Sequence, residues 1–273
     1  MSRKLEGYMK KRLSVFIPAY NEEGNIEPTI FELRTALHAL NLEYEIIVVN
    51  DGSSDRTAEI AEGLSRNDPR IRVIHNPKNL GLAKTFRIGA QAARFDFVGW
   101  IPGDNGFPAS SLEQWLRPIG QADLIQTYLS NMEVRYIGRR VISRLYTRTM
   151  NALFGLNLKY YNGIQVYRRE LIQNVESSSD GFALQSEILV KLLAMGNTYI
   201  EVGLRMQERL QGESKAVKLK NILDVIKTVI RLFFEVKLLH RSRYRSRGVK
   251  LQASIATGAP LGGAVGTKYG QSA

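Results

Sequence analysis

The 273-residue sequence contains no cysteine, which excludes disulfide bonds, thiolate nucleophiles and cysteine-based zinc sites. Its three histidines, His38, His75 and His240, lie too far apart to form a His-x-x-x-His metal pair, and we expect each to be an ordinary structural or surface residue. No signal peptide is apparent at the charged N-terminus, and no uninterrupted apolar run reaches the roughly 18 residues that a membrane-spanning helix requires. These absences are compatible with a reducing compartment, and we expect the protein to work on the cytoplasmic side of any membrane it uses.

The composition is that of a folded protein with an uneven charge. Hydrophobic residues make up 44% of the chain and charged residues 23%, and the formal net charge is +12. Eleven basic residues lie between Lys215 and Lys250, where only Asp224 and Glu235 oppose them. Nucleic acid, anionic lipid and phosphate-bearing substrates are therefore the candidate partners of the C-terminal part.

Short apolar runs alternate with segments of helical spacing over the first hundred residues. The runs are residues 13–17, 45–49, 71–74 and 97–101, and the helical segments are residues 26–40, 57–64 and 82–93. Such alternation predicts right-handed βαβ crossovers and a mostly parallel sheet with helices on both faces, an α/β fold.

The second half is less regular. The sequence predicts helices over residues 134–154, which are strongly basic, and over residues 181–195. From Leu219 to Phe233 apolar residues recur at steps of three and four, which predicts an amphipathic helix within a basic segment that spans residues 216–250. The Ala/Gly-rich residues 251–273 predict a flexible tail.

Polar clusters follow three of the expected strands. They are residues 18–23, 50–55 and 102–108, and they place Asp51 and Asp104 at one edge of the sheet. Asp-Gly and Asp-Asn-Gly sequences also form simple turns. Because ligands of open parallel sheets bind beyond the carboxyl ends of the strands, three clusters at strand ends favour a binding site.

These segments resemble family-2 glycosyltransferases with the GT-A fold. The matching motifs are Val15-Phe-Ile-Pro-Ala-Tyr-Asn-Glu22, Val48-Val-Asn-Asp-Gly-Ser-Ser-Asp-Arg-Thr57 and Asn79-Leu-Gly81. Later segments resemble polyprenyl-phosphate (dolichol-phosphate type) sugar synthases: Arg209-Leu-Gln-Gly-Glu-Ser-Lys215, Asn162-Gly163 and Gly181-Phe-Ala-Leu-Gln-Ser-Glu187. The resemblance covers residues 13–215, and we expect a catalytic domain over residues 1–215 with a donor half (13–108) and an acceptor half (109–215).

The resemblance implies a role for each matching residue. The nucleotide of a UDP- or GDP-sugar donor would contact Pro18, Tyr20, Glu22, Asp51, Gly81 and Ser214, with Asp51 bonding the base. Asp104 would be the remaining carboxylate of an Asp-x-Asp motif that binds Mg²⁺ or Mn²⁺, and Arg209 and Lys215 would close over phosphate oxygens.

The chain departs from this pattern at the metal motif. Pro102 stands where the first Asp is expected, and Gly106 where a Gln is often found. The metal would then have fewer protein ligands, or be held mainly by the phosphates of the donor. A degenerate, non-catalytic nucleotide-sugar-binding protein is the further alternative that Pro102 raises.

The acceptor determines whether a base is needed. A phosphate monoester is mostly dianionic near neutral pH and attacks without one, whereas a sugar hydroxyl needs a positioned base. The resemblance therefore implies inverting transfer to a polyprenyl phosphate. Glu187 is the candidate base for the alternative, a sugar or glycan hydroxyl acceptor.

The basic C-terminal segment is explained in two ways. Its helix either packs on the catalytic domain or lies on the anionic inner face of a membrane. Nucleic acid binding is disfavoured because no recognised motif accompanies the charge.

Overall fold

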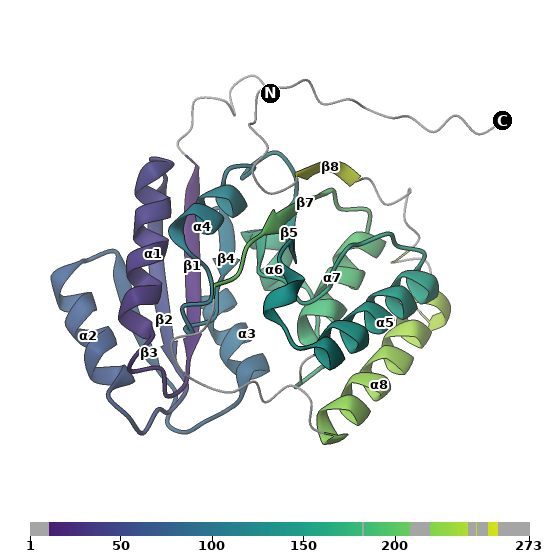
Figure 1. The fold of residues 1–273 in the computed structure, drawn as a ribbon, viewed down its shortest axis with the longest axis horizontal. Helices are drawn as coiled ribbons and strands as arrows, with labels where there is room; N and C mark the ends of the chain where they lie inside the picture. Colours follow the sequence, from purple (N-terminus) through teal and green to yellow (C-terminus); the bar gives the residue numbers. More distant parts are fainter. Residues whose placement is uncertain (1–10, 182, 208–218, 240–243, 245–250, 256–273) are drawn as a thin grey trace.

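The computed structural model describes residues 11–181, 183–207, 219–239, 244 and 251–255, with the backbone alone at 219–222 and 251–255. An eight-stranded sheet, with strand order β3-β2-β1-β4-β6-β5-β7-β8, runs through the molecule (Figure 1). The strands are β1 (Arg12–Ala19), β2 (Glu43–Asn50), β3 (Ile71–His75), β4 (Phe97–Trp100), β5 (Leu124–Leu129), β6 (Gln165–Arg168), β7 (Tyr199–Leu204) and β8 (Leu251–Ile255). The helices are α1 (Ile26–Ala39), α2 (Thr57–Asn67), α3 (Leu82–Ala92), α4 (Ala109–Leu116), α5 (Ile137–Phe154), α6 (Arg169–Asn174), α7 (Leu184–Ala194) and α8 (Leu219–Phe234), with a 3₁₀ turn η1 (Met132–Val134) and a π-helix η3 (Glu235–Leu239).

The sheet is mostly parallel, as the alternation of strands and helices predicts. Only β6 is antiparallel to its neighbours β4 and β5, so the carboxyl ends of β1, β2, β4, β5 and β7 lie at one edge. Successive strands step from β1 to β2 and β3 on one side, and β4 then pairs with the other side of β1. The strand order therefore reverses between β1 and β4, the position where open α/β sheets bind ligands.

The first strand continues through Pro18 instead of stopping before it. The carbonyl oxygens of Phe16 and Pro18 accept from Ile101 and Gly103, so this side of β1 faces β4. Proline has no N–H to donate toward β4. Because β4 ends at Trp100 and pairs only with residues 13–16 of β1, the β1–β4 ladder loses no hydrogen bond at Pro18.

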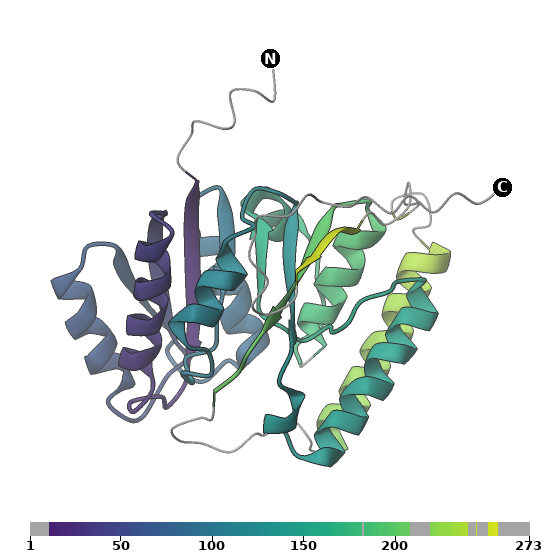
Figure 2. The same ribbon diagram turned by 45° about the horizontal axis from the view of Figure 1, so that its top comes forward.

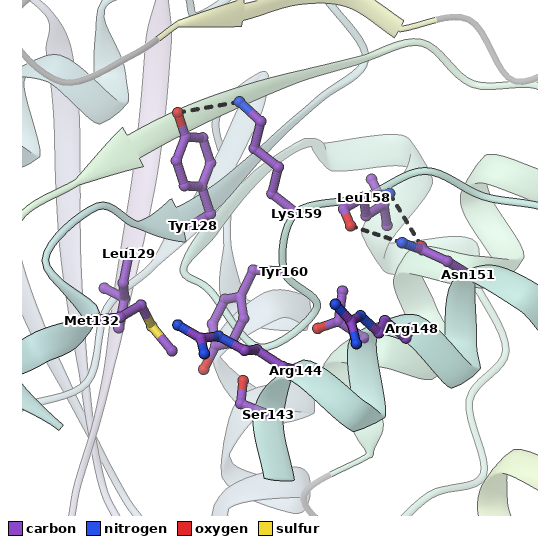
Figure 3. Close-up of a pocket in the computed structure, with 11 residues that line it drawn as sticks. Tyr128, Leu129, Met132, Ser143, Arg144, Arg148, Asn151, Leu158, Lys159 and Tyr160 are labelled. Carbon is purple, nitrogen blue, oxygen red and sulfur yellow. Dashed lines mark hydrogen bonds between the residues drawn. The ribbon is translucent and has the colours of Figure 1, made fainter. Parts of the chain in front are cut away.

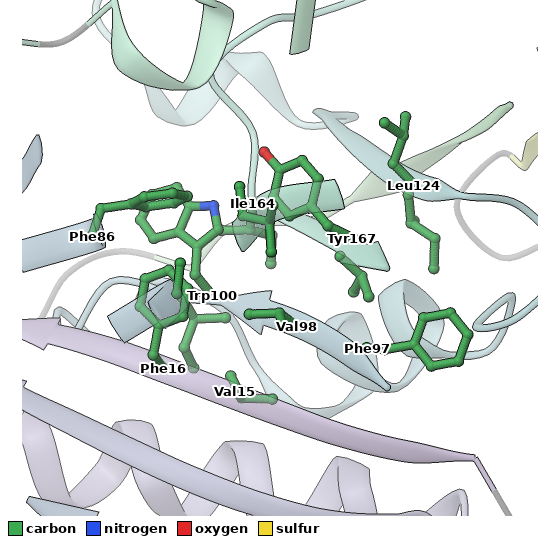
Figure 4. Packing of buried hydrophobic residues seen from close by; sticks show 14 of the residues in the cluster. Val15, Phe16, Phe86, Phe97, Val98, Trp100, Leu124, Ile164 and Tyr167 are labelled. Atoms are coloured by element: carbon green, nitrogen blue, oxygen red, sulfur yellow. The ribbon is translucent and has the colours of Figure 1, made fainter. Parts of the chain in front are cut away.

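Aromatic rings fill the space between the sheet and α3 (Figure 4). The ring of Phe16 meets that of Phe86 edge-on at 4.9 Å, and Phe86 meets Trp100 in the same way at 5.5 Å. Helix α3 approaches closely at Gly89, where a Cβ atom would lie 2.4 Å from the Phe16 ring. This packing fixes the end of β4 immediately before the Asp104 loop.

Helix α8 packs on the catalytic domain, one of the two arrangements expected for it. Leu232 and Val236 are buried, and the Phe233 ring lies 6.4 Å from that of Phe154 at the end of α5. The Lys237 ammonium also donates to the Phe154 carbonyl oxygen at 3.2 Å. Figures 1 and 2 show α5 and α8 side by side at one end of the molecule.

The segment that the sequence predicts as a flexible tail begins with a strand. Residues 251–255 form β8, which pairs in parallel with β7 at the edge of the sheet. Its sequence, Leu-Gln-Ala-Ser-Ile, alternates apolar and polar residues, a period-two pattern that the Ala/Gly-rich composition beyond it obscured.

Candidate functional site

The loops after β1 and β2 are tied together at the switch point. The Asn21 amide donates to the Ser53 hydroxyl at 3.0 Å, and the Ser54 amide returns a bond to the Asn21 side chain at 2.9 Å. The Glu22 amide donates to the Thr57 hydroxyl at 2.7 Å. Since Asn21 adopts φ 55°, these bonds hold a backbone conformation that few side chains accept. The first motif, which contains Pro18, Tyr20 and Glu22, is thus hydrogen-bonded to the second.

The carboxylate of Asp51 organises a third loop. It is buried and accepts the backbone N–H groups of Leu80 and Gly81, both at 2.9 Å, and the Asn76 amide at 2.8 Å. Burial of a carboxylate is tolerated here because each of its oxygens is hydrogen-bonded. Asp51 therefore links the end of β2 to Gly81 at the start of α3, and both residues belong to the predicted donor site.

The loop after β4 carries Asp104. Asp104 is 7% exposed, and the next residue, Asn105, takes φ 50° while its backbone N–H donates to the Thr29 hydroxyl at 2.9 Å. A Cβ atom at Gly106 would lie 3.1 Å from Asp104 Oδ1, so a side chain at this position would crowd the carboxylate. Glycine at 106 thus leaves room beside the Asp104 carboxylate.

The chain leaving β7 docks on this loop. Gln207 donates its amide to the Gly106 carbonyl at 3.0 Å and its side chain to the Asn105 carbonyl at 2.8 Å. One residue earlier, Met206 exchanges two hydrogen bonds with the Asn131 side chain, at 2.7 and 2.8 Å. Residues 206–207 therefore connect the Asp104 loop to the chain after β5.

Three of the predicted phosphate-loop residues cannot be placed. Arg209, Ser214 and Lys215 lie outside the described residues. In sequence, Arg209 follows by two residues Gln207, which is hydrogen-bonded to the Asp104 loop.

A pocket of about 300 Å³ opens beyond the end of β5, and Met132, the residue after Asn131, is one of its lining residues (Figure 3). It is lined by β5, η1, α5 and the loop before β6, and it contains three cationic side chains, Arg144, Arg148 and Lys159, with the hydroxyl groups of Ser143 and Thr147. No acidic side chain of the described residues lines the pocket. The ammonium group of Lys159 lies 4.3 Å from the ring centre of Tyr128 and 3.3 Å from its hydroxyl. The pocket is therefore suited to an anionic group.

A buried polar chain connects this pocket to the end of β4. The Trp100 indole donates to Gln165 at 2.6 Å, Gln165 donates to Gln126 at 3.0 Å, and Gln126 donates to the Tyr160 carbonyl at 3.0 Å. The loop approaches β5 so closely that a Cβ atom at Gly163 would lie 2.2 Å from the Thr127 oxygen. The Asn162-Gly163 motif therefore positions the pocket wall.

Glu187 lies in a network that anchors α8. It is 1% exposed, its oxygens accept the backbone N–H groups of Ser178 and Ser179 at 3.1 and 2.9 Å, and Lys191 pairs with it at 3.0 Å. Burial alone would raise the pKa of Glu187, but the hydrogen bonds from Ser178, Lys191 and Ser179 lower it below its ordinary value. The network continues to α8 and η3 through Arg231, 3.4 Å from Glu187, and Glu235, 2.7 Å from Lys191. A carboxylate of low pKa with both oxygens engaged is better suited to holding elements together than to accepting a proton.

The side chains supply one ligand for a divalent cation at the switch point. Within the described ranges, no group of three His, Asp or Glu side chains is close enough to hold a metal by itself. Asp104 fits a cation that takes most of its oxygen ligands from a bound diphosphate and water, because Mg²⁺ commonly keeps such ligands.

The structure thus assembles most of the predicted site. It brings Pro18, Tyr20, Glu22, Asp51, Gly81 and Asp104 to one edge of the sheet, whereas Glu187 belongs to the α7–α8 junction. The pocket beyond β5 was not predicted from the sequence. Its one local signal was the basic spacing of Arg140, Arg144 and Arg148, which places three guanidinium groups on one row of a helix.

Comparison with known proteins agrees with this geometry. The sequence profile of Glycosyl transferase family 2 matches residues 14–175. The chain is 30% identical over 229 residues to dolichol-phosphate mannosyltransferase of Pyrococcus furiosus, covering 81% of this chain and 63% of the relative. It is 28% identical over 197 residues to the putative glycosyltransferase EpsH of Bacillus subtilis, covering 64% and 52%. The chain therefore spans about half to two thirds of the length of these two relatives.

Solved structures share the fold. Glucosyl-3-phosphoglycerate synthase from Mycobacterium tuberculosis, crystallised with Mn²⁺, UDP and phosphoglyceric acid, superposes with a TM-score of 0.61 at 20% identity over 82% of this chain and 78% of that one. Its complex with Mg²⁺ and UDP gives 0.59 at 19% identity, over 87% and 81%. The order of the strands, the polar loops at the switch point and the profile match lead to one conclusion: the chain belongs to glycosyltransferase family 2 and has the GT-A fold.

Proposed function

We propose that this glycosyltransferase transfers a sugar from a nucleotide-diphosphate sugar to a polyprenyl phosphate, with inversion at the anomeric carbon. The observation that carries the proposal is the cationic pocket beyond β5, joined to the Asp104 loop through Asn131 and residues 206–207. A relative, the dolichol-phosphate mannosyltransferase of Pyrococcus furiosus, carries a lipid-phosphate acceptor in its name.

The pocket fits the charge of a phosphate monoester. Arg144 and Arg148 can bind phosphate oxygens through their planar forks, and Lys159 adds a point charge. Such an acceptor attacks as a dianion and needs no base. One of its oxygens bonds to the anomeric carbon while the bond from that carbon to the donor diphosphate breaks, and the nucleoside diphosphate leaves. The chain's task is therefore to hold two anions in line.

The donor would occupy the switch point. Pro18, Tyr20 and Glu22 would border the nucleotide, together with the loop that Asp51 holds through Gly81. Asp104 would hold a Mg²⁺ or Mn²⁺ shared with the diphosphate, and such a cation neutralises charge on the leaving group. Arg209, Ser214 and Lys215 would contact the phosphates from the segment that follows Gln207.

A hydroxyl acceptor with Glu187 as base is the alternative, and the contacts of Glu187 speak against it. Both of its oxygens are engaged, and the N–H and ammonium donors around it lower its pKa. A base that must take a proton from a hydroxyl gains from a raised pKa, not a lowered one.

The test is transfer of radiolabel from UDP- and GDP-sugars into organic-extractable polyprenyl phosphate, with Mg²⁺, Mn²⁺ or EDTA. We expect labelled lipid with one donor, and loss of it in Asp104→Ala. Labelled glycan without labelled lipid would support the hydroxyl acceptor. Donor binding without turnover on any acceptor would support the degenerate alternative, and Pro102→Asp would then test whether the first carboxylate restores activity.

The pocket is tested separately by Arg144→Ala with Arg148→Ala. We expect KM for polyprenyl phosphate to rise by about tenfold or more, since each charge-assisted bond contributes roughly 1.5–3 kcal/mol, while the affinity for the donor is unchanged. Arg66→Ala, at an exposed arginine on α2, is the matched control. An unchanged KM in the double variant would remove the acceptor from this pocket.

A further inference from the structure

Helices α5 and α8 expose apolar side chains at helical spacing. On α5, Ile137, Val141 and Leu145 are 69%, 55% and 65% exposed and follow one another at steps of four. On α8, a second row consists of Leu223, Ile226, Ile230 and Phe234, each about half exposed. We call these seven residues the α5–α8 face.

These rows are not the ones that hold the helices to the domain. Helix α8 packs inward through Thr228 and Leu232, and α5 packs inward through Met150 and Phe154, all of which are buried. Each helix therefore carries one apolar row for the core and another turned away from it. A single isolated apolar side chain on a surface is ordinary, but two such rows on adjacent helices are not.

The two helices present their outer rows at the same end of the molecule. Phe154, the last residue of α5, contacts Phe233 and Lys237 near the end of α8, so the helices run in the same direction. Both figures of the fold show them as neighbours, on the side opposite α1 and α2 (Figures 1 and 2).

Basic residues flank the face. Helix α5 contains four arginines and no acidic residue, and Arg140, Arg144 and Arg148 form the row next to Ile137, Val141 and Leu145. On α8, Lys227 is exposed beside Ile226 and Ile230. Apolar rows bordered by cations are typical of helices that lie in the headgroup region of anionic membranes.

We propose that the α5–α8 face docks on an anionic lipid bilayer, with its apolar rows entering the boundary between headgroups and acyl chains. None of the helices in the described part of the chain is long and apolar enough to cross a bilayer. Docking in the plane of the interface needs no such helix. Because Arg144 and Arg148 belong both to the flanking row and to the pocket, the pocket would open at the membrane surface.

The test is co-sedimentation with vesicles of phosphatidylcholine alone or mixed with phosphatidylglycerol, without donor and without polyprenyl phosphate. We expect binding to the anionic vesicles that weakens as salt is added, and a loss of about tenfold or more in Val141→Glu with Ile230→Glu. Phe31→Glu is the matched control, because Phe31 is 68% exposed on α1 at the opposite side. Circular dichroism and thermal unfolding confirm that the variants fold.

A second variant tests the charge without changing an apolar residue. Lys227→Glu should lower binding to anionic vesicles several-fold, since each basic residue near the surface contributes about fivefold in affinity. Arg66→Glu should leave it unchanged. The proposal would be overturned if the wild type does not bind anionic vesicles, or if the Val141→Glu with Ile230→Glu variant binds them as strongly as the wild type does. A wild-type dimer that Val141→Glu with Ile230→Glu dissociates would also overturn it, because the face would then join two copies. Since the vesicles lack the acceptor, failure of docking and failure of the proposed reaction are separate results.

Discussion

Gly52 shows how one residue without a side chain permits the donor loops to meet. It adopts φ 67°, and a Cβ atom there would lie 2.5 Å from the backbone carbon of Lys78. Gly52→Ala should therefore destabilise the fold by about 2 kcal/mol or more and weaken nucleotide binding. Gly63 on α2 has ordinary space for a methyl group, so Gly63→Ala should stabilise by about 0.5–1 kcal/mol. Urea unfolding of both variants would check the contrast, and equal effects would contradict it.

The residues of the donor loops were predictable because their signals are local. Asp51 and Asp104 follow apolar runs by two or three residues, where the chain must turn, whereas Gly81 was predicted only through the resemblance of Asn79-Leu-Gly81 to family-2 glycosyltransferases. The partners of Asp51 could not be predicted: its carboxylate accepts the backbone N–H groups of Leu80 and Gly81, which lie about thirty residues away in the sequence. The sequence identifies the residue, and only the fold identifies its contacts.

At the scale of elements, Glu187 determines how α7 holds α8. Glu187→Gln removes a charge from a buried pair with Lys191, which keeps Glu235 as its other partner. We expect a loss of about 3 kcal/mol in the free energy of unfolding, at the low end for breaking a buried pair. Transfer activity per folded molecule should change little, because the carboxylate is not proposed to contact substrate. Complete loss of activity in a variant of unchanged stability would instead support Glu187 as a base.

Asp123 joins three strands and makes their stability depend on pH. It accepts the amide and hydroxyl of Thr198 at 2.8 and 2.6 Å and pairs with Arg168 at 3.0 Å. Burial alone would raise the pKa of Asp123, but the bonds from Thr198 and Arg168 lower it below its ordinary 3.8. The stabilisation is therefore complete above the unfolded-state pKa and is lost as the pH falls through the folded-state value. Thermal unfolding of wild type and Asp123→Asn should differ most near pH 7, and the difference should shrink as the pH falls below 3.8 and through the folded-state pKa; a constant difference would contradict the assignment.

Six of the described helices and the first four strands were predicted to within about three residues of their ends, but α4, α6, β5, β6 and β7 were not identified. Each of these three strands buries a polar residue: Gln126, Gln165 and Glu201. Gln165 bonds to Gln126, and Glu201 accepts the amide of Lys159, so the partners that make burial acceptable come from distant segments. A strand whose polar residue is satisfied only by the tertiary fold has no clear pattern in a single sequence.

At the scale of the whole molecule, donor binding should stabilise the chain in a metal-dependent way. The proposed nucleoside diphosphate at a hundred times its Kd adds about 2.7 kcal/mol, which corresponds to a rise in Tm of several degrees. Because Asp104 supplies only one carboxylate, we expect EDTA to reduce this rise and Asp104→Ala to make it insensitive to EDTA. The same rise with Mn²⁺ and with EDTA in the wild type would show that the nucleotide binds without a cation.

The cationic pocket exists only in the assembled molecule. Tyr128, Arg144 and Lys159 come from a strand, a helix and a loop, and no spacing in the sequence relates them. The basic character of residues 134–154 is evident in the sequence, but whether these arginines line a pocket depends on which side of α5 faces the end of β5.

Strand β8 has a consequence for how the chain can be shortened. It covers the outer edge of β7, a strand whose six residues are all buried. A variant that ends at Lys250 would leave a row of unpaired backbone groups on a hydrophobic strand, which invites pairing between molecules. Light scattering should detect self-association in that variant and not in one that ends at Ile255. Strand β8 would then prevent aggregation through the edge of β7, and the soluble expression of shortened chains would depend on whether they retain residues 251–255.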